Sequence, residues 1–278
     1  MRRLVLLILF IFFLTLPVRA QPRKDLTLWV HPYLPATELT DHFSPLASYL
    51  GKALGIPVVI RVQPSYQSHL DFVGRDQADI AFLGPASYVL IHRRYDAKPL
   101  LAKLELNGKP FFHGMIIARL DSGLDTLGDL AGKSFAFGDP NSTMAHIVPR
   151  GMLQEAGITL NSLQRHDFLY SHQNVALAVL GGYFDAGAVK EEVFHEFKDR
   201  GLTMLAQSPP IAEHLFVTRS DLPPELIEKI RFHLLDITRH PEGREILQTM
   251  KQGTTDLVPV TDSDYDSLRK IMKSLENE

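Results

Sequence analysis

The clearest structural signal in the chain is the segment Phe135-Ala136-Phe137-Gly138-Asp139-Pro140-Asn141-Ser142-Thr143. Its apolar start predicts a buried strand, its middle predicts a tight turn, and its hydroxyl residues predict the start of a helix. Ser, Thr and Asn are preferred caps at helix N-termini, where unpaired N–H groups and the helix dipole favour an anion. Ser142 and Thr143 are therefore candidate anion-binding residues, although the same residues would also cap a helix that binds nothing. Pro149 predicts either a kink in this helix or a start later than Thr143.

Strand-like and helix-like runs alternate on both sides of this segment. Before it, the sequence predicts strands at 26–30, 57–62 and 79–83 and helices at 37–54 and 66–75. From it onward, the sequence predicts strands at 134–137, 165–169, 185–189, 202–207 and 215–218 and helices from 142, at 174–180, 223–237, 241–250 and 264–275. The alternation predicts an α/β protein with mainly parallel sheets. Asn107-Gly108 predicts a hairpin turn that adds one antiparallel pair, formed by 99–106 and 112–118.

The N-terminus predicts export. Two arginines precede the apolar run 4–14, and residues 17–20 approximate a small-residue cleavage site, so residues 1–20 are expected to be a cleavable signal peptide. An uncleaved N-terminal anchor is the alternative. The chain has no cysteine, which excludes disulfides, thiolate metal sites and a lipid-anchored N-terminus. We therefore expect a periplasmic protein that is not a lipoprotein.

The net charge and the absence of catalytic motifs argue against two classes of function, nucleic-acid binding and catalysis. The formal net charge of −3 becomes −6 once the three arginines of residues 1–20 are removed, which argues against nucleic acid as a partner. An anionic ligand would have to be held by local dipoles. The sequence carries no nucleophile elbow, phosphate-binding P-loop, dinucleotide fingerprint or His-Glu-x-x-His motif, so we expect no enzyme and no cofactor.

Five motifs, taken in order, resemble a known family. They are Asp79 to Tyr88 (Asp-Ile-Ala-Phe-Leu-Gly-Pro-Ala-Ser-Tyr), Asp129 to Lys133 (Asp-Leu-Ala-Gly-Lys), Asp139 to Thr143, His172 with the helical run after it, and Asp185 to Val189 (Asp-Ala-Gly-Ala-Val). Together they are similar to the phosphate-, phosphite- and phosphonate-binding periplasmic proteins of ABC transporters. The similarity extends from about Leu26 to Leu275.

The resemblance implies a two-lobed, type II periplasmic-binding-protein fold that closes on its ligand about a hinge of two crossing strands. The crossings would fall near 112–118 and 207–216. Residues 21–112 would then form the first part of lobe 1, residues 113–213 lobe 2, and residues 214–278 the second part of lobe 1. Closure would follow from ligand contacts to both lobes.

The resemblance also implies a ligand site. Tyr66 matches a tyrosine that binds a ligand oxygen, Ser142 and Thr143 match the first two hydroxyl residues of a phosphonyl cradle, and His172 matches the histidine that completes the cradle. Glu192, or Glu191 beside it, matches one of two acids that receive the amine of aminophosphonates in some members.

Three positions depart from the family pattern and are expected to redirect specificity. Met144 replaces the third hydroxyl, Phe112 replaces a second tyrosine, and His214 replaces an aspartate. Because histidine replaces one of the two acids, a zwitterionic aminoalkylphosphonate is a doubtful ligand. Phosphate, phosphite, an alkylphosphonate or another small anion remain open.

Three roles remain compatible with the sequence. The first is a monomeric solute-binding protein that delivers a small phosphorus oxyanion to an ABC permease. The second is a protein of the same fold that signals to a membrane sensor kinase, because fold alone does not separate the two roles. A weaker third is a metal-transport protein that uses cleft histidines such as His113, His172 and His214.

Overall fold

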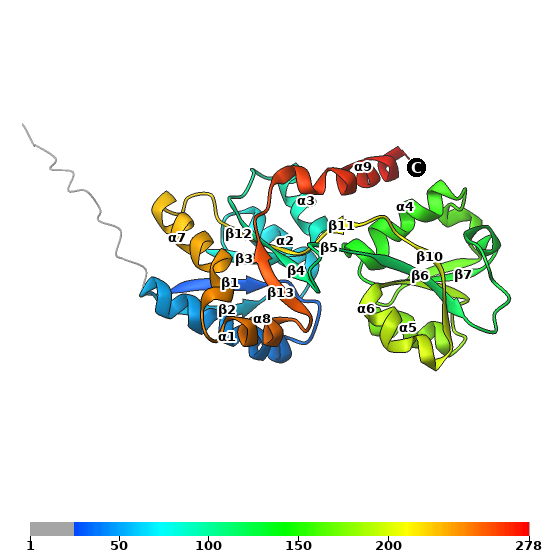
Figure 1. Cartoon of the computed structure of the whole chain (residues 1–278). Coiled ribbons are helices and arrows are strands. Elements are labelled where there is room, and N and C mark those ends of the chain that lie inside the picture. The colour runs from blue at the N-terminus through cyan, green and yellow to red at the C-terminus, as the bar shows by residue number, and fades with distance from the viewer. Residues whose placement is uncertain (1–24, 278) are drawn as a thin grey trace, which may run out of the picture.

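The computed structural model describes residues 25–277. The signal peptide expected at 1–20 lies outside this range. Within it, no helix is long and apolar enough to cross a membrane. Two α/β lobes lie side by side and are joined by extended chain (Figure 1). The two-lobed α/β fold expected from the resemblance is confirmed.

A six-stranded sheet organises the first lobe, in the order β13-β4-β12-β3-β1-β2. Its strands are β1 (Leu26–Val30), β2 (Val58–Val62), β3 (Ile80–Leu83), β4 (Leu100–Leu106), β12 (Leu215–Thr218) and β13 (Thr254–Val258). Its helices are α1 (Ala36–Leu54), α2 (Tyr66–Gly74), α3 (Pro85–Arg94), α7 (Pro224–Leu235) and α8 (Gly243–Met250). All four residues of β3 are buried, because one cluster of apolar side chains covers each face of the sheet.

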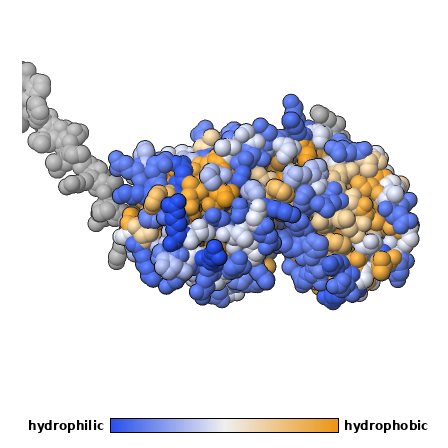
Figure 2. All heavy atoms as spheres, viewed as in Figure 1, coloured by the Kyte–Doolittle hydropathy of each residue, from blue (hydrophilic) through white to orange (hydrophobic). Residues whose placement is uncertain are grey.

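A five-stranded sheet organises the second lobe, in the order β10-β6-β9-β7-β8. Its strands are β6 (Gly114–Arg119), β7 (Ser134–Phe137), β8 (Arg165–Phe168), β9 (Ala186–Lys190) and β10 (Leu202–Gln207). Its helices are α4 (Val148–Glu155), α5 (His172–Leu180) and α6 (Glu191–Phe197). Separate apolar clusters pack on its two faces. In Figure 2 the surface is hollowed between the lobes along the lower edge, and apolar residues are most evident on the right-hand lobe.

Two short strands connect the lobes. β5 (Phe111–Phe112) and β11 (Ile211–Ala212) pair antiparallel, with Ile211 opposite Phe112. Beyond this pair, the Gly114 N–H donates to Ser208 Oγ at 2.9 Å, and the Ser208 N–H donates to the Gly114 carbonyl at 2.9 Å. Two lobes held by a narrow ribbon can rotate about it as a hinge.

The sheets are mixed, so the expectation of mainly parallel sheets is wrong. Parallel pairing is confined to β1 with β2 and β3 and to β7 with β8 and β9. Every other pair includes a strand that leads into or out of the hinge, and all of these pairs are antiparallel. The chain leaves through β4–β6 and returns through β10–β12, so the departing and returning strands run in opposite directions.

Several local expectations are also corrected. Asn107 and Gly108 form the expected tight turn, with φ of 49° and 76°, but the strands on its two sides do not pair with each other. Helix α3, which was not predicted from the sequence, follows Gly84, because proline fits the first turn of a helix. Strand β13 was not expected from the sequence.

The C-terminal helix α9 (Asp266–Ser274) contacts both lobes. It packs on α3 of the first lobe and on α4 of the second. Its buried Leu268 and Met272 form the apolar face expected of an amphipathic helix. In Figure 1 it runs along the upper side of the molecule above the connecting strands.

Candidate functional site

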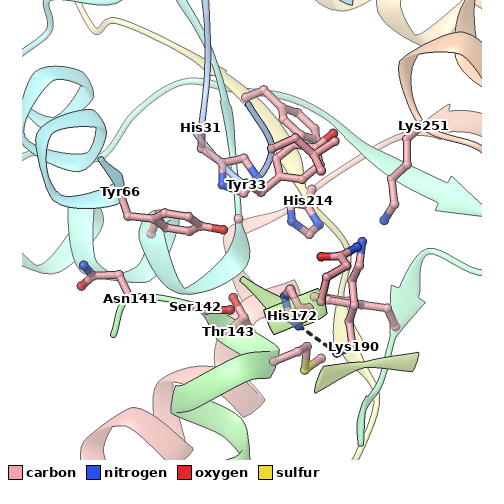
Figure 3. A pocket seen from close by; sticks show the side chains of 17 residues that line it. His31, Tyr33, Tyr66, Asn141, Ser142, Thr143, His172, Lys190, His214 and Lys251 are labelled. Carbon is pink, nitrogen blue, oxygen red and sulfur yellow. Dashed lines mark hydrogen bonds between the residues drawn. The ribbon is translucent and has the colours of Figure 1, made fainter. Parts of the chain in front are cut away.

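An enclosed cavity lies between the lobes (Figure 3). The first lobe and the hinge contribute His31, Tyr33, Tyr66, Gly84, Phe112, His214 and Lys251, and the second lobe contributes Asn141, Ser142, Thr143, Met144, His172 and Lys190. The cavity leaves about 50 Å³ for the centres of water-sized molecules. In this arrangement of the lobes it suits a ligand of a few heavy atoms.

The segment after β7 supplies one wall. The Ser142 hydroxyl accepts a hydrogen bond from the Ala145 N–H at 3.2 Å, so Ser142 caps the π-helical turn Thr143–Ile147. Regular helix α4 begins only at Val148, with Pro149 in its first turn. The later helix start allowed by Pro149 is therefore confirmed, and the π-helical turn carries the candidate anion-binding residues.

Gly138 lets this turn approach β7. A Cβ atom added to Gly138 would lie 2.4 Å from the Cβ of Ala145, well inside contact distance. We expect Gly138→Ala to displace the turn and to lower the free energy of unfolding by about 1–3 kcal/mol, as overpacked sites do. Urea unfolding measures this, with Gly128→Ala, which has no close neighbour except the Thr126 hydroxyl at 3.5 Å, as the control. Equal stability of the two variants would contradict the prediction.

Two helix N-termini meet at Thr143. The Thr143 hydroxyl accepts a hydrogen bond from the Ala86 N–H in the first turn of α3, at 3.0 Å. Since a hydroxyl has one hydrogen to donate besides its acceptor sites, Thr143 and Ser142 both keep an O–H donor for a ligand. The positive ends of two helix dipoles favour negative charge at this place.

Tyr66 begins α2 in the first lobe. Ser65 caps this helix through a reciprocal hydrogen-bond pair with Ser68. The Tyr66 ring stands edge-on to His31, with ring centroids 5.2 Å apart. Burial raises the pKa of Tyr66 well above its usual value, so its hydroxyl stays protonated and can donate a hydrogen bond into the cavity.

His172 presents a defined donor. The Lys190 N–H donates to its Nδ1 at 3.0 Å, shown as a dashed line in Figure 3. Burial lowers the pKa of His172 to about 3, so the ring is neutral at pH 7. With Nδ1 accepting, the proton is on Nε2, which is the tautomer that can donate to an oxyanion.

Apolar side chains form part of the wall. Met144 is 1% exposed and packs in one core cluster with Phe112. Both residues also line the cavity. The two departures from the family pattern therefore place a methionine and a phenyl ring beside the donors, so this side of the cavity lacks the two hydroxyl groups.

His31 was missed in the sequence. It follows β1, is 2% exposed, and neither of its ring nitrogens has a hydrogen-bond partner within residues 25–277. Burial, with a smaller contribution from His214, keeps its pKa well below 6.5. Its position at the carboxyl end of a predicted strand could have indicated it, because ligands of α/β sheets bind at those ends. Lys190, the last residue of β9, was missed for the same reason.

The remaining two predicted residues are His214 and Glu192, and only one of them lines the cavity. His214 lines the cavity, and its Nδ1 lies 2.7 Å from Oε2 of the fully buried Glu213. Glu192 does not line this cavity but an adjoining open groove. Burial would raise the pKa of Glu192, but Lys251 and Lys190 outweigh burial and lower it to about 2, so the carboxylate is charged.

A metal site finds no support in the geometry. Within residues 25–277, no group of three or more histidine, cysteine, aspartate or glutamate side chains is arranged to hold a metal ion. His172 and His214 line the cavity, whereas Nδ1–H of His113 donates to the Ser208 carbonyl, 2.8 Å away.

Two lobes, a connecting ribbon and a small cavity between them that is lined by hydrogen-bond donors define the class of periplasmic substrate-binding proteins. Residues 28–265 match the family model described as the periplasmic substrate-binding protein of phosphonate ABC transporters. Because the match covers most of the chain, the chain belongs to this family. The resemblance identified from the motifs is confirmed.

Characterised relatives agree with this assignment. The chain is 28% identical to the phosphate-import protein PhnD of Mycolicibacterium smegmatis, over 89% of this chain and 85% of the relative. It is 24% identical to the phosphonates-binding periplasmic protein of Escherichia coli, over 76% of this chain and 66% of the relative. The structure of PhnD1 from Prochlorococcus marinus in complex with methylphosphonate superposes with a TM-score of 0.81, at 19% identity, over 92% of this chain and 99% of that one. This last likeness supports the fold.

Proposed function

We propose that this protein captures a small phosphorus oxyanion in the cavity between its lobes and delivers it to the membrane permease of an ABC transporter. One observation carries the proposal: the hydroxyls of Ser142 and Thr143, the phenol of Tyr66 and Nε2–H of His172 converge on one enclosed cavity from both lobes. Neutral donors and helix dipoles suit an oxyanion, which accepts several hydrogen bonds at once.

The wall chemistry favours a ligand with one substituent that is not oxygen. Phe112 and Met144 present apolar surface, against which the hydrogen of phosphite or the methyl of methylphosphonate packs better than a fourth phosphate oxygen. The space of about 50 Å³ for the centres of water-sized molecules suits these small anions. The family match favours transport over a role in sensing.

The proposal extends to the maturation of the exported chain and to its oligomeric state. We infer that residues 1–20 are removed on export, that the mature chain carries no lipid anchor, and that it acts as a monomer without catalysis. The absence of cysteine supports the second inference. Mass spectrometry of the exported protein tests the cleavage, and sedimentation tests the monomer.

A ligand panel tests the function. We expect residues 21–278 to be stabilised by methylphosphonate, phosphite or phosphate, by about 2.7 kcal/mol at a hundredfold excess over Kd. Thermal shift followed by titration calorimetry measures this, with sulfate as a control for shape and zinc with chelator as a control for metal binding. If none of the three phosphorus anions stabilises the protein, the proposed function is wrong. A shift with zinc alone would restore the metal-transport alternative.

A further inference from the structure

A buried ion cluster closes one end of the cavity. Lys251, which follows α8, places its Nζ 3.2 Å from Oε1 of Glu192 and 3.3 Å from Oε1 of Glu213. Glu192 begins α6 of the second lobe, and Glu213 lies between β11 and β12. The ammonium of Lys251 is therefore held between carboxylates from two parts of the structure.

The two carboxylates are held differently. Glu213 is fully buried, and its Oε2 accepts hydrogen bonds from the His214 N–H at 2.8 Å and from Nδ1 of the same residue at 2.7 Å. The carboxylate of Glu192 has no hydrogen-bond partner within the described part of the chain besides the ion pair with Lys251. Burial would lower the pKa of Lys251, but Glu213 and Glu192 outweigh it and raise the pKa, so the ammonium stays charged.

The cluster stands where a ligand substituent would leave the cavity. Lys251 and Lys190 line both the enclosed cavity and the adjoining open groove, which Glu192 lines as well. In Figure 3 Lys251 and Tyr66 lie on opposite sides of the cavity, with the Lys251 amine directed toward its interior. A phosphonate held by Ser142 and Thr143 would thus extend its carbon chain toward the groove past this ion pair.

We propose that Lys251 is a built-in ammonium that occupies the place of a ligand amine and so makes the site select phosphorus anions that carry no amine. The inference rests on the proposed function and adds the ligand subclass. An aminoalkylphosphonate would bring a second ammonium to carboxylates already paired with Lys251, and the two cations would repel each other. For an anion without an amine, the same Lys251 charge is attractive.

The substitution Lys251→Ala should reverse the preference between ligands that carry an amine and ligands that do not. We compare 2-aminoethylphosphonate with propylphosphonate, which has the same size and the same phosphonate group but carries no ammonium on its carbon chain. We expect wild type to bind 2-aminoethylphosphonate at least tenfold more weakly than propylphosphonate. In Lys251→Ala the freed carboxylates receive the ligand ammonium, and we expect the order to reverse by at least tenfold. Titration calorimetry measures both Kd values for both proteins.

Two further variants distinguish the effect of the charge at position 251 from the effect of the room that a smaller side chain leaves. Lys251→Arg keeps a cation and should keep the wild-type order. The double variant Lys251→Ala/Glu192→Gln leaves as much room as Lys251→Ala but removes one carboxylate, and it should lose most of the gain for 2-aminoethylphosphonate. An unchanged ratio of the two Kd values in Lys251→Ala, or a gain that the double variant retains in full, would overturn the inference.

The test does not depend on the folding of one variant. Leaving Glu213 buried without its cation destabilises the protein, so Lys251→Ala is also heated with ethylammonium chloride, which should raise its melting temperature and not that of wild type. If the variant does not fold, the wild-type comparison decides: equal or tighter binding of 2-aminoethylphosphonate overturns the inference. Failure of wild type to bind methylphosphonate, phosphite and phosphate would instead overturn the proposed function.

Discussion

Acidification from pH 6.5 to pH 4.5 is expected to cost the ligand-free protein about 4 kcal/mol of stability through His69 and His172 alone. Burial lowers the pKa of His69 to about 4 and that of His172 to about 3, against 6.5 for an ordinary histidine. Between these values the unfolded chain binds protons that the folded chain does not, so the free energy of unfolding falls as the pH falls. The loss is a large part of the roughly 5–15 kcal/mol typical of a domain.

Histidine titration dominates this pH window, because carboxylate effects enter only near pH 4.5. Glu192 has its folded pKa lowered to about 2, so its contribution is present above its ordinary pKa of 4.5 and is lost only as the pH falls further. Urea unfolding at pH 6.5, 5.5 and 4.5 measures the slope. His172→Gln keeps an acceptor for the Lys190 N–H and removes one titrating ring, and it should reduce the average slope by about 1 kcal/mol per pH unit. Equal stability at pH 6.5 and pH 4.5 would refute the assignment of neutral buried rings.

Thr143→Val is expected to weaken oxyanion binding by about 1–3 kcal/mol, or roughly five- to 150-fold in Kd. Valine has the shape of threonine but no hydroxyl, so the ligand loses a donor. The Ala86 N–H loses its acceptor at the same time, which also removes a contact between α3 and the π-helical turn. Titration calorimetry with the best phosphorus anion of the panel gives the change in Kd.

Thr143→Ser is the matched control, because it keeps the hydroxyl and removes only a methyl group. It should bind within a few-fold of wild type. Far-UV circular dichroism confirms that each variant is folded before its Kd is measured. If Thr143→Val binds as tightly as wild type, the oxyanion lies elsewhere in the cavity.

Local sequence patterns were sufficient to predict the strands, turns and helix starts that depend on nearby residues. The apolar run of β7 and the hydroxyl residues after it predicted a strand and a capped turn, and both form. Pro149 predicted a kink or a late helix start, because proline cannot donate the hydrogen bond that a helix interior needs, and α4 starts late. The order of the five motifs was sufficient to predict the family, because that order is far more specific than any one motif.

The pairing of strands that are far apart in the chain could not be predicted from the sequence. β13 was missed and the sheets were expected to be mainly parallel, because strand direction depends on where the hinge sends the chain and not on the composition of the strand. His31 was also missed, because it is one of twelve histidines in the chain and the residues beside it form no motif. Its importance follows from the strand end on which it lies.

The signal for export, the α/β class, the family and the hydroxyl residues of the candidate site all follow from the order of residues along the chain. The ion cluster of Lys251, Glu192 and Glu213 does not, because its members come from three separate segments and meet only when both lobes and the hinge are in place. Buried charges are tolerated only where partners surround them, and those partners are set by tertiary packing. Chain-local chemistry therefore predicts an anion site, whereas we propose that the folded arrangement decides which anions it accepts.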